Sequence, residues 1–144
     1  MADKLNEAGK MCQNNGLKLA YHNHAFEFVA LADGSVPQDL IFEGGPDLEW
    51  EADIAWIIRS GADPLDWIKW YGDRITAVHV KDIAPEGESA DEDGWADVGH
   101  GTVDWAGIMA ALRATPCSNF VMEHDNPSDH ARFATRSIIA AKGF

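Results

Sequence analysis

The chain has 144 residues, and 24 Asp and Glu against 11 Lys and Arg give it a formal net charge of −13. This length predicts one domain over residues 1–144, and 46% hydrophobic with 24% charged residues is ordinary globular usage, sufficient for a hydrophobic core. So large a negative charge, with no basic cluster to offset it, excludes nucleic acid and anionic membrane as favoured partners and leaves small neutral or metal-bridged ligands.

Cysteine usage and the N-terminal sequence indicate the compartment. Only Cys12 and Cys117 are present, too few for a disulfide scaffold and not spaced as a zinc site, so we expect two reduced thiols. The N-terminus is polar from the start, and nowhere do about 18 apolar residues follow one another. These features predict a cytoplasmic protein without an export signal or a membrane span.

The first third of the chain is predicted to form a helix, a strand, an irregular segment and a second strand. Residues 3–15 place apolar side chains on one helical face before the stop signal Asn15-Gly16, and residues 17–22 form a short apolar strand. Residues 30–47, rich in Gly and Pro, suit a loop or an irregular hairpin. Residues 48–54 alternate as a strand with three carboxylates on one face. These are Glu49, Glu51 and Asp53.

The middle of the chain continues with helices and a buried strand. Residues 55–60 are predicted to form a short helical turn closed by Gly61. Asp63-Pro64 is a helix cap followed by a first-turn proline, and it opens a helix to residue 71. The β-branched run over residues 75–80 predicts a buried strand.

The last third is predicted to hold a loop, two helices and a strand. Residues 82–97 contain seven acidic residues and no Lys or Arg, which is typical of a long, exposed loop. Asp104 caps a helix that Pro116 ends, and residues 119–124 form another strand. Ser128 or Asp129 starts a last helix to residue 141.

Strands that alternate with helices imply an α/β fold with a parallel sheet, in which sites lie at the carboxyl ends of the strands. Those ends carry, in chain order, Glu27, Asp53, His79 and Glu123. Their spacings are 26, 26 and 44 residues, and the longest interval contains the acidic loop, so one ligand-type residue recurs in each unit. Three carboxylates and one imidazole around a point suit a divalent cation of the Mn²⁺, Co²⁺ or Mg²⁺ type.

Each of these four residues also has a purely structural interpretation. Glu27 could cap a turn, and Asp53 could be a helix N-cap. His79 could be a satisfied core histidine, and Glu123 could pair with a lysine. We favour the metal site because all four occur together.

Five motifs, in order, carry a resemblance to a known family. They are YHNHAFEF (21–28), EADIAW (51–56), RITAVHVKD (74–82), DVGHGTVDW (97–105) and VMEHD (121–125). They resemble the xylose isomerase-like TIM-barrel proteins, the sugar phosphate isomerase/epimerase and inosose dehydratase group. The resemblance covers almost the whole chain but only the C-terminal half of the family's barrel, which implies a parallel (βα)4 unit corresponding to strands five to eight.

The resemblance implies one catalytic divalent metal ion, Mn²⁺ by first choice with Co²⁺, Mg²⁺ or Zn²⁺ as alternatives, bound by Glu27, Asp53, His79 and Glu123. Glu27 and Glu123 are then also the acid/base pair, one on each face of a metal-bound hydroxy-ketone or hydroxy-aldehyde sugar. They would move a proton through an enediolate that the metal stabilises.

Further residues beside these positions are expected to serve the site. His24 and Lys81 could hydrogen-bond substrate hydroxyls or the developing oxyanion, and Trp56 could form an apolar wall against the carbon face of a small sugar or cyclitol. Asp82 is expected to be a supporting partner or a loop cap rather than a ligand.

The number of strands predicts association. A barrel of this kind closes with eight strands, and four leave two sheet edges unpaired. We therefore expect a homodimer whose edge strands meet, another chain that supplies the first half of the barrel, or a truncated product.

The predicted function is a metal-dependent sugar isomerase or epimerase. One alternative is an inosose dehydratase-type lyase, because isomerisation, epimerisation and dehydration all begin with proton abstraction next to a carbonyl. Another is a catalytically incompetent, metal-binding half-barrel fragment. The net charge of −13 disfavours the endonucleases of the same superfamily, which need a basic face for DNA.

Overall fold

The computed structural model describes residues 2–144, and Met1, which opens the predicted polar N-terminus, lies outside them. Its main sheet has four parallel strands, paired in the order in which they follow one another along the chain. They are β1 (Ala20–His22), β2 (Glu49–Asp53), β3 (Ile75–Val80) and β6 (Asn119–Met122). The predicted α/β class with a parallel sheet is confirmed. A short antiparallel pair follows β3, formed by β4 (Asp82–Ile83) and β5 (Trp95–Ala96).

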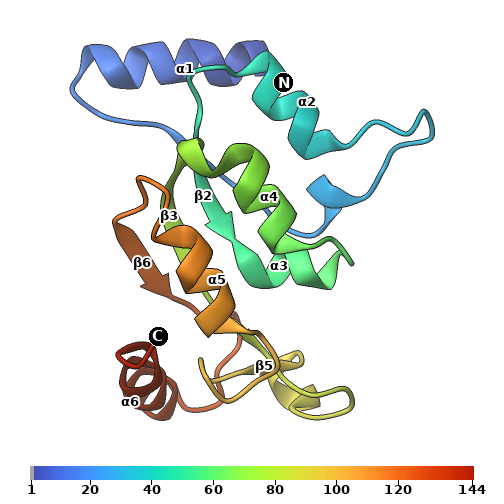
Figure 1. Cartoon of the computed structure of the whole chain (residues 1–144), viewed down its shortest axis with the longest axis vertical. Coiled ribbons are helices and arrows are strands. Elements are labelled where there is room, and N and C mark those ends of the chain that lie inside the picture. The colour runs from blue at the N-terminus through green and yellow to red at the C-terminus, as the bar shows by residue number, and fades with distance from the viewer. Residues whose placement is uncertain (1) are drawn as a thin grey trace.

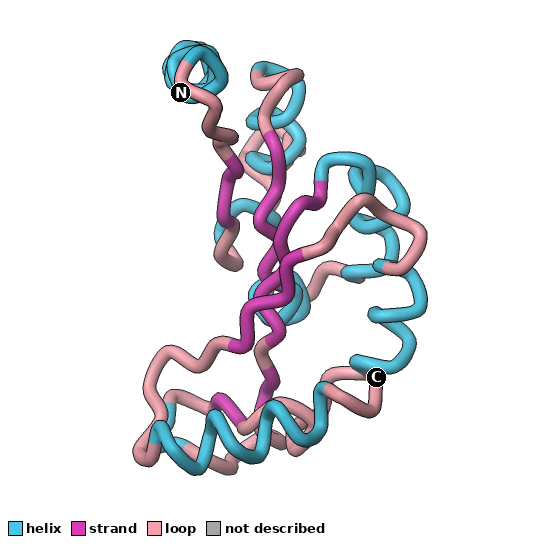
Figure 2. Tube along the Cα trace, turned by 90° about the vertical axis from the view of Figure 1, so that its left-hand side faces the viewer, coloured by secondary structure: helices cyan, strands magenta, loops and turns pink. Residues whose placement is uncertain are grey.

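Helices connect these strands, and two of them stand on the same side of the sheet. The α-helices are α1 (Ala2–Asn14), α2 (Pro37–Gly44), α3 (Ile54–Arg59), α4 (Pro64–Tyr71), α5 (Trp105–Leu112) and α6 (His130–Ala141). Single 3₁₀ turns are η1 (Phe26–Phe28), η2 (Gly72–Arg74) and η3 (Ala90–Glu92). In Figure 1, α1 and α6 lie at opposite ends of the molecule, and α4 and α5 lie in front of the strands. Figure 2 shows the same layering from the side.

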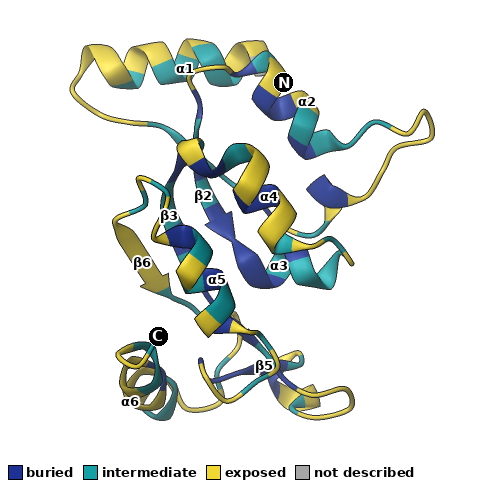
Figure 3. Cartoon of the chain, viewed as in Figure 1, coloured by how far each residue is buried: buried dark blue, intermediate teal, exposed yellow. Residues whose placement is uncertain are grey.

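The sheet does not close on itself. Within residues 2–144, β1 and β6 each pair with one neighbour, so each leaves one row of backbone groups without a strand partner. Figure 3 shows the central strand β2 largely buried and β6 exposed. On β6, Phe120 and Val121 are 42% and 43% exposed although both are apolar. The described chain is thus an open four-stranded sheet whose core lies between the strands and the helices on one side.

Capping residues start the helices where the sequence predicts. Asp63, Asp104 and Asp129 each accept a hydrogen bond from a backbone N–H in the first turn of α4, α5 and α6. The strand predicted over residues 75–80 is confirmed as β3. The strand predicted over residues 17–22 is shorter, because Leu17 is 62% exposed and pairing begins only at Ala20.

The irregular segment predicted over residues 30–47 is wrong for its second half, which forms α2. Pro37 occupies the first turn of this helix, where its missing N–H costs nothing and its fixed φ suits the helix. Gly44 and Gly45 end the helix rather than disrupt it. Buried Ile41 and Phe42 hold α2 against the core.

The prediction that residues 82–97 form an exposed loop is also wrong in part. Asp82 is fully buried, and its two carboxylate oxygens accept hydrogen bonds from four backbone N–H groups of this segment and its continuation. Glu92 and Asp97 are buried as well, and Arg132 of α6 bonds to both carboxylates. Two of the seven acidic side chains are thus paired with an arginine that lies far along the chain. The loop-cap role expected of Asp82 is confirmed.

Two further predictions concern thiols and membrane helices. Cys12 and Cys117 are both free. Among the helices described between residues 2 and 144, none combines the length and the apolar character needed to cross a bilayer.

Candidate metal centre at the strand ends

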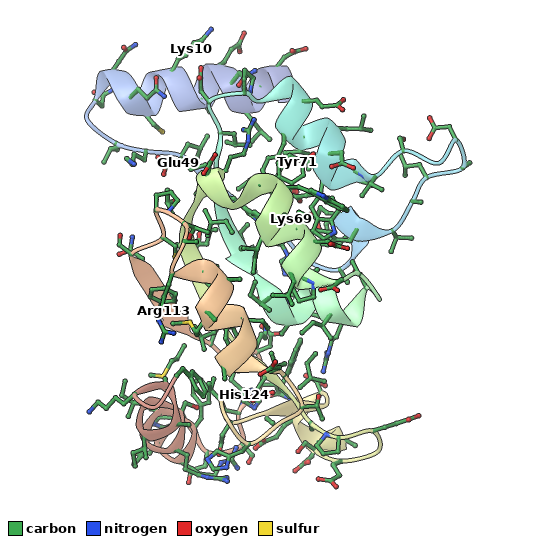
Figure 4. All side chains as sticks on the ribbon, viewed as in Figure 1. Lys10, Glu49, Lys69, Tyr71, Arg113 and His124 are labelled. Carbon is green, nitrogen blue, oxygen red and sulfur yellow. The ribbon has the colours of Figure 1, made fainter. Side chains whose placement is uncertain are left out.

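The carboxyl ends of β2, β3 and β6 bring three of the four predicted ligand residues together. Nδ1 of His79 lies 2.8 Å from Oε2 of Glu123 and 3.6 Å from Oδ2 of Asp53. A register irregularity between Trp50 and Glu51 contributes, because it adds one residue on β3 and places Asp53 directly opposite His79. Figure 4 labels the two ends of the sheet, with Glu49 at the start of β2 and His124 just after β6.

Asp53 uses its two carboxylate oxygens differently. Oδ1 accepts the backbone N–H of Trp56 at 3.0 Å and so caps α3, which is the structural role that the sequence left open. Oδ2 is buried and takes part in no hydrogen bond within the described chain. The backbone of Asp53 is fixed by the buried Asn23 side chain, which accepts its N–H at 3.0 Å and donates to its carbonyl at 3.1 Å.

Glu27, the fourth predicted ligand, is buried in η1 and is held by its own segment. Its Oε1 accepts the hydroxyl of Tyr21 at 2.7 Å, and its Oε2 accepts the backbone N–H of His24 at 2.8 Å. Burial, followed by this hydrogen bond to Glu27, raises the pKa of Tyr21 well above its usual range. Among residues 2–144, no hydrogen bond or ion pair joins Glu27 to Asp53, His79 or Glu123.

His22 belongs to the cluster although the sequence reasoning did not assign it as a ligand. One ligand-type atom each of His22, Asp53 and His79 lie within 4.8 Å of one another. The rings of His22 and His79 have their centroids 4.4 Å apart, and Nδ1 of His22 is buried without a hydrogen-bond partner. Its position as the last residue of β1 was the available signal, because strand ends hold the other members.

Lys81 is fully buried at the same end of the sheet. Its Nζ lies 2.6 Å from Asp125, 3.2 Å from Glu123 and 3.7 Å from Asp53. The ammonium also lies 4.3 Å from the ring centroid of Trp95. Lys81 therefore contacts the carboxylate cluster directly, in the place where the sequence expected a substrate-binding residue.

Two tryptophans and one histidine form the wall beside this lysine. The Trp56 and Trp95 rings meet edge to face with centroids 4.9 Å apart. His24 is exposed, and its ring lies 5.4 Å from that of Trp56. Trp95 was missed from the sequence because it lies in the acidic segment expected to be solvated; it is only 1% exposed.

The carboxylates favour positive charge at the centre of the cluster. The carboxylate of Asp53 close to Nδ1, then hydrogen bonding to Glu123 and Glu51, raises the pKa of His79 to about 10 against the opposing effect of burial. Hydrogen bonding to His79, supported by Lys81, lowers the pKa of Glu123 to about 2. Surroundings that stabilise a proton on an imidazole to this degree also favour a bound cation.

The donor set fits a divalent metal ion. Imidazole nitrogens and carboxylate oxygens at one point suit Mn²⁺, Co²⁺ and related ions, and the soft thiolate ligands that select other metals are lacking from this cluster of described residues. Buried Asp53 Oδ2 and His22 Nδ1 both lack hydrogen-bond partners, a condition that ligation would relieve. The residues present are therefore compatible with a metal centre.

Comparisons with known proteins identify the family and the fold. Residues 1–140 match the family model of the xylose isomerase-like TIM barrel. The inosose dehydratase of Bacillus cereus (strain AH820) is 34% identical over 95 residues, which are 60% of this chain and 28% of that protein. That of Geobacillus kaustophilus is 35% identical over 85 residues, 58% of this chain and 27% of that protein.

Solved structures share the fold at low sequence identity. A sugar phosphate isomerase/epimerase from Parabacteroides distasonis superimposes with a TM-score of 0.75 and 20% identity, covering 97% of this chain and 49% of that one. The probable 3-DHS dehydratase AsbF from Bacillus anthracis gives a TM-score of 0.76 and 14% identity, covering 98% of this chain and 55% of that one. The chain thus spans about half the length of these solved relatives. Because the family model extends over nearly all of its residues, the chain belongs to the xylose isomerase-like TIM-barrel family.

Proposed function

We propose that this protein is a divalent-metal-dependent enzyme that acts on a small polyhydroxylated carbonyl compound, a sugar or a cyclitol, by removing a proton next to the carbonyl. The observation that carries the proposal is the contact of Asp53, His79 and Glu123 at the strand ends, with Oδ2 of Asp53 buried and free of hydrogen bonds. The names of its relatives, inosose dehydratase and sugar phosphate isomerase/epimerase, support this class of substrate.

Four residues are proposed to hold the ion, with Mn²⁺ as first choice and Co²⁺, Mg²⁺ or Zn²⁺ as alternatives. They are Glu27, Asp53, His79 and Glu123. His22 is a further donor within reach of Asp53 and His79, and its unpartnered Nδ1 supports its inclusion. A divalent ion held there would polarise a substrate carbonyl and stabilise negative charge on its oxygen.

Glu27 and Glu123 are proposed as the acid/base pair. They approach from different strands, Glu27 from the turn after β1 and Glu123 from the end of β6, which suits proton removal on one face and return on the other. The lowered pKa of Glu123 keeps its carboxylate ionised at neutral pH. Tyr21 and the His24 N–H fix the carboxylate of Glu27 in one orientation.

Substrate binding is assigned to His24, Lys81 and Trp56. His24 is exposed beside Trp56, and the buried ammonium of Lys81 contacts Glu123, so both supply hydrogen-bond donors next to the cluster. Trp56, packed edge to face on Trp95, supplies the apolar wall on which the carbon face of a sugar ring could lie.

The fate of the intermediate separates two candidate activities. Return of the proton gives isomerisation or epimerisation, whereas departure of a hydroxyl gives dehydration. The solved relatives include proteins described in both ways. The inosose dehydratases, at 34–35% identity, support the lyase as second candidate.

We also propose that the open sheet is one half of a barrel, the strands five to eight of the family, completed by a second copy or by a chain that carries the first four strands. Two observations support this: β1 and β6 each have one unpaired edge among the described residues, and the solved relatives are about twice as long as this chain. An apolar cavity of about 230 Å³ beside β6, lined in part by Phe120, Met122, Ile138 and Phe144, could receive side chains of such a partner. A well-folded monomer in sedimentation at micromolar concentration would contradict the homodimer.

The first experiment is calorimetric titration of Mn²⁺ into chelator-treated protein. We expect one-to-one binding, micromolar or tighter, that is lost in Glu123→Gln and in His79→Ala. Glu43→Gln and His100→Ala, which change exposed residues of the same types, are the matched controls and should bind normally. A folded wild-type protein that binds no Mn²⁺ would refute the metal-dependent function and leave the catalytically incompetent fragment.

The second experiment follows the chemistry itself. Ketoses and inososes are incubated with the Mn²⁺-loaded protein in deuterated water, and proton NMR monitors the hydrogen next to the carbonyl. Its exchange for deuterium is expected for all three reactions, and the product distinguishes isomer, epimer and dehydrated compound. Metal binding without exchange on any of these substrates would contradict the proposed proton transfer.

A further inference from the structure

Three carboxylates of the described chain approach His79, and Glu51 is the one that the proposed ligand set does not use. Its Oε1 lies 3.0 Å from Nε2 of His79. Glu51 is two residues before Asp53 on β2, so the two side chains emerge on the same face of the sheet. The register places Glu51 opposite Ala77. The small side chain of Ala77 leaves room for the imidazole of His79 to contact Glu51.

The two nitrogens of His79 face different partners. Nδ1 points at Glu123 and Asp53, the proposed ligands, at 2.8 and 3.6 Å. Nε2 points at Glu51. The two ring nitrogens of an imidazole point in different directions. A carboxylate that is hydrogen-bonded to Nε2 therefore does not reach an ion that is bound at Nδ1. Glu51 is therefore placed to act on His79 rather than on the ion.

We propose that Glu51 is a positioning residue that accepts a hydrogen bond from Nε2–H of His79 and so presents the Nδ1 lone pair to the metal ion. The inference rests on the proposed metal-dependent function. A neutral imidazole carries one proton, and the hydrogen bond that one nitrogen makes decides which nitrogen is free to ligate. Metal-binding histidines commonly donate their second N–H to a carboxylate, and loss of such a partner costs about 10- to 100-fold in metal affinity.

The alternative is that Glu51 contributes only negative charge to the region. Glu49 provides a matched comparison, because it lies on the same strand and face but at its start, where it pairs with Lys18 at 2.6 Å. Figure 4 labels Glu49 at the end of the sheet away from His124. Glu49→Gln therefore controls for the loss of a carboxylate from this strand, and Glu51→Gln separates charge from positioning, because it removes the charge but keeps an acceptor for Nε2–H of His79.

The test measures Mn²⁺ affinity by calorimetry in the wild type, Glu51→Ala, Glu51→Gln and Glu49→Gln. We expect about a 10- to 100-fold loss for Glu51→Ala and no change for Glu49→Gln. Glu51→Gln should retain part of the Mn²⁺ affinity, because its amide oxygen can still accept a hydrogen bond from Nε2–H of His79. Circular dichroism melts verify that each variant is folded.

A second readout observes the proton directly. Imidazole ¹⁵N spectra of the Zn²⁺-loaded protein, in which the ion is diamagnetic, should show His79 bound through Nδ1 with a protonated Nε2. The wild-type spectrum alone decides this if Glu51→Ala does not fold. Ligation through Nε2, or Glu51→Ala affinity within threefold of wild type, would overturn the inference while the metal-dependent function stands. A wild type that binds neither ion would overturn both.

Discussion

Replacing the buried Asn23 by Ala tests how the fold holds the metal centre in place. The Asn23 side chain joins the turn after β1 to β2 through three hydrogen bonds. Its Oδ1 accepts Nε1 of Trp50 at 2.8 Å and the backbone N–H of Asp53 at 3.0 Å, and its Nδ2 donates to the Asp53 carbonyl at 3.1 Å. One side chain thus positions both backbone groups of a proposed ligand.

The expected loss of stability follows from the groups left behind. Asn23→Ala removes the partner of two donors and one acceptor, and Asn23, Trp50 and Asp53 are all fully buried. A buried group left unsatisfied costs about 1–3 kcal/mol, so even the low end gives a loss of about 3 kcal/mol in the free energy of unfolding. Mn²⁺ affinity should fall as well, because the Asp53 backbone is no longer fixed.

Urea denaturation followed by tryptophan fluorescence measures the stability, and Asn15→Ala is the control. Asn15 makes one exposed hydrogen bond to the Met11 carbonyl, so its loss should cost less than about 1 kcal/mol. A loss below about 1 kcal/mol for Asn23→Ala would show that Trp50 and Asp53 find other partners, and the reasoning would fail.

Three further predictions concern the acidic segment and the ion. Glu92→Gln should lower the unfolding free energy at pH 7 by about 1–3 kcal/mol, because hydrogen bonds from Ser128 and then Arg132 lower the pKa of Glu92 from 4.5 to about 2. That contribution is present above pH 4.5 and is lost as the pH falls towards 2, so urea melts of variant and wild type should converge in acid; a constant difference would contradict it. Gly101→Ala should destabilise by about 1–3 kcal/mol in the same assay, because its Cβ would overlap the Asp82 carboxylate, and an unchanged melt would show that the segment shifts freely. Mn²⁺ at a hundredfold excess over its dissociation constant should stabilise the protein by about 2.7 kcal/mol, reversed by chelator, and an unchanged melting temperature would argue against the site.

The sequence predicted local structure well where short-range chemistry determines it. Caps such as Asp63 and Asp104 act within one helical turn, so their sequence neighbourhood is sufficient. The errors arise where the conformation of a segment depends on residues that are distant in the sequence. Pro37 and Gly44 indicate a break when read alone, yet they begin and end a helix once Ile41 and Phe42 have a core to pack against.

The same limit applies to the site. Asp53, His79 and Glu123 were predicted to meet, and they do so because strand ends share an edge of the sheet. Trp95 could not be found in this way, because burial of the acidic segment depends on Arg132 of the last helix. His22 was not predicted as a ligand, although it is the last residue of the strand predicted over residues 17–22, because Glu27 was assigned to that strand end.

The strand order of the sheet has a consequence for how such a protein can change in length. Because every strand of the main sheet lies next to its chain neighbour, each strand with its following helix is a module that docks onto the preceding one. Modules can be added to or removed from either edge without threading the chain through an existing structure. Gene duplication, fusion and fission can therefore act on this architecture in whole modules.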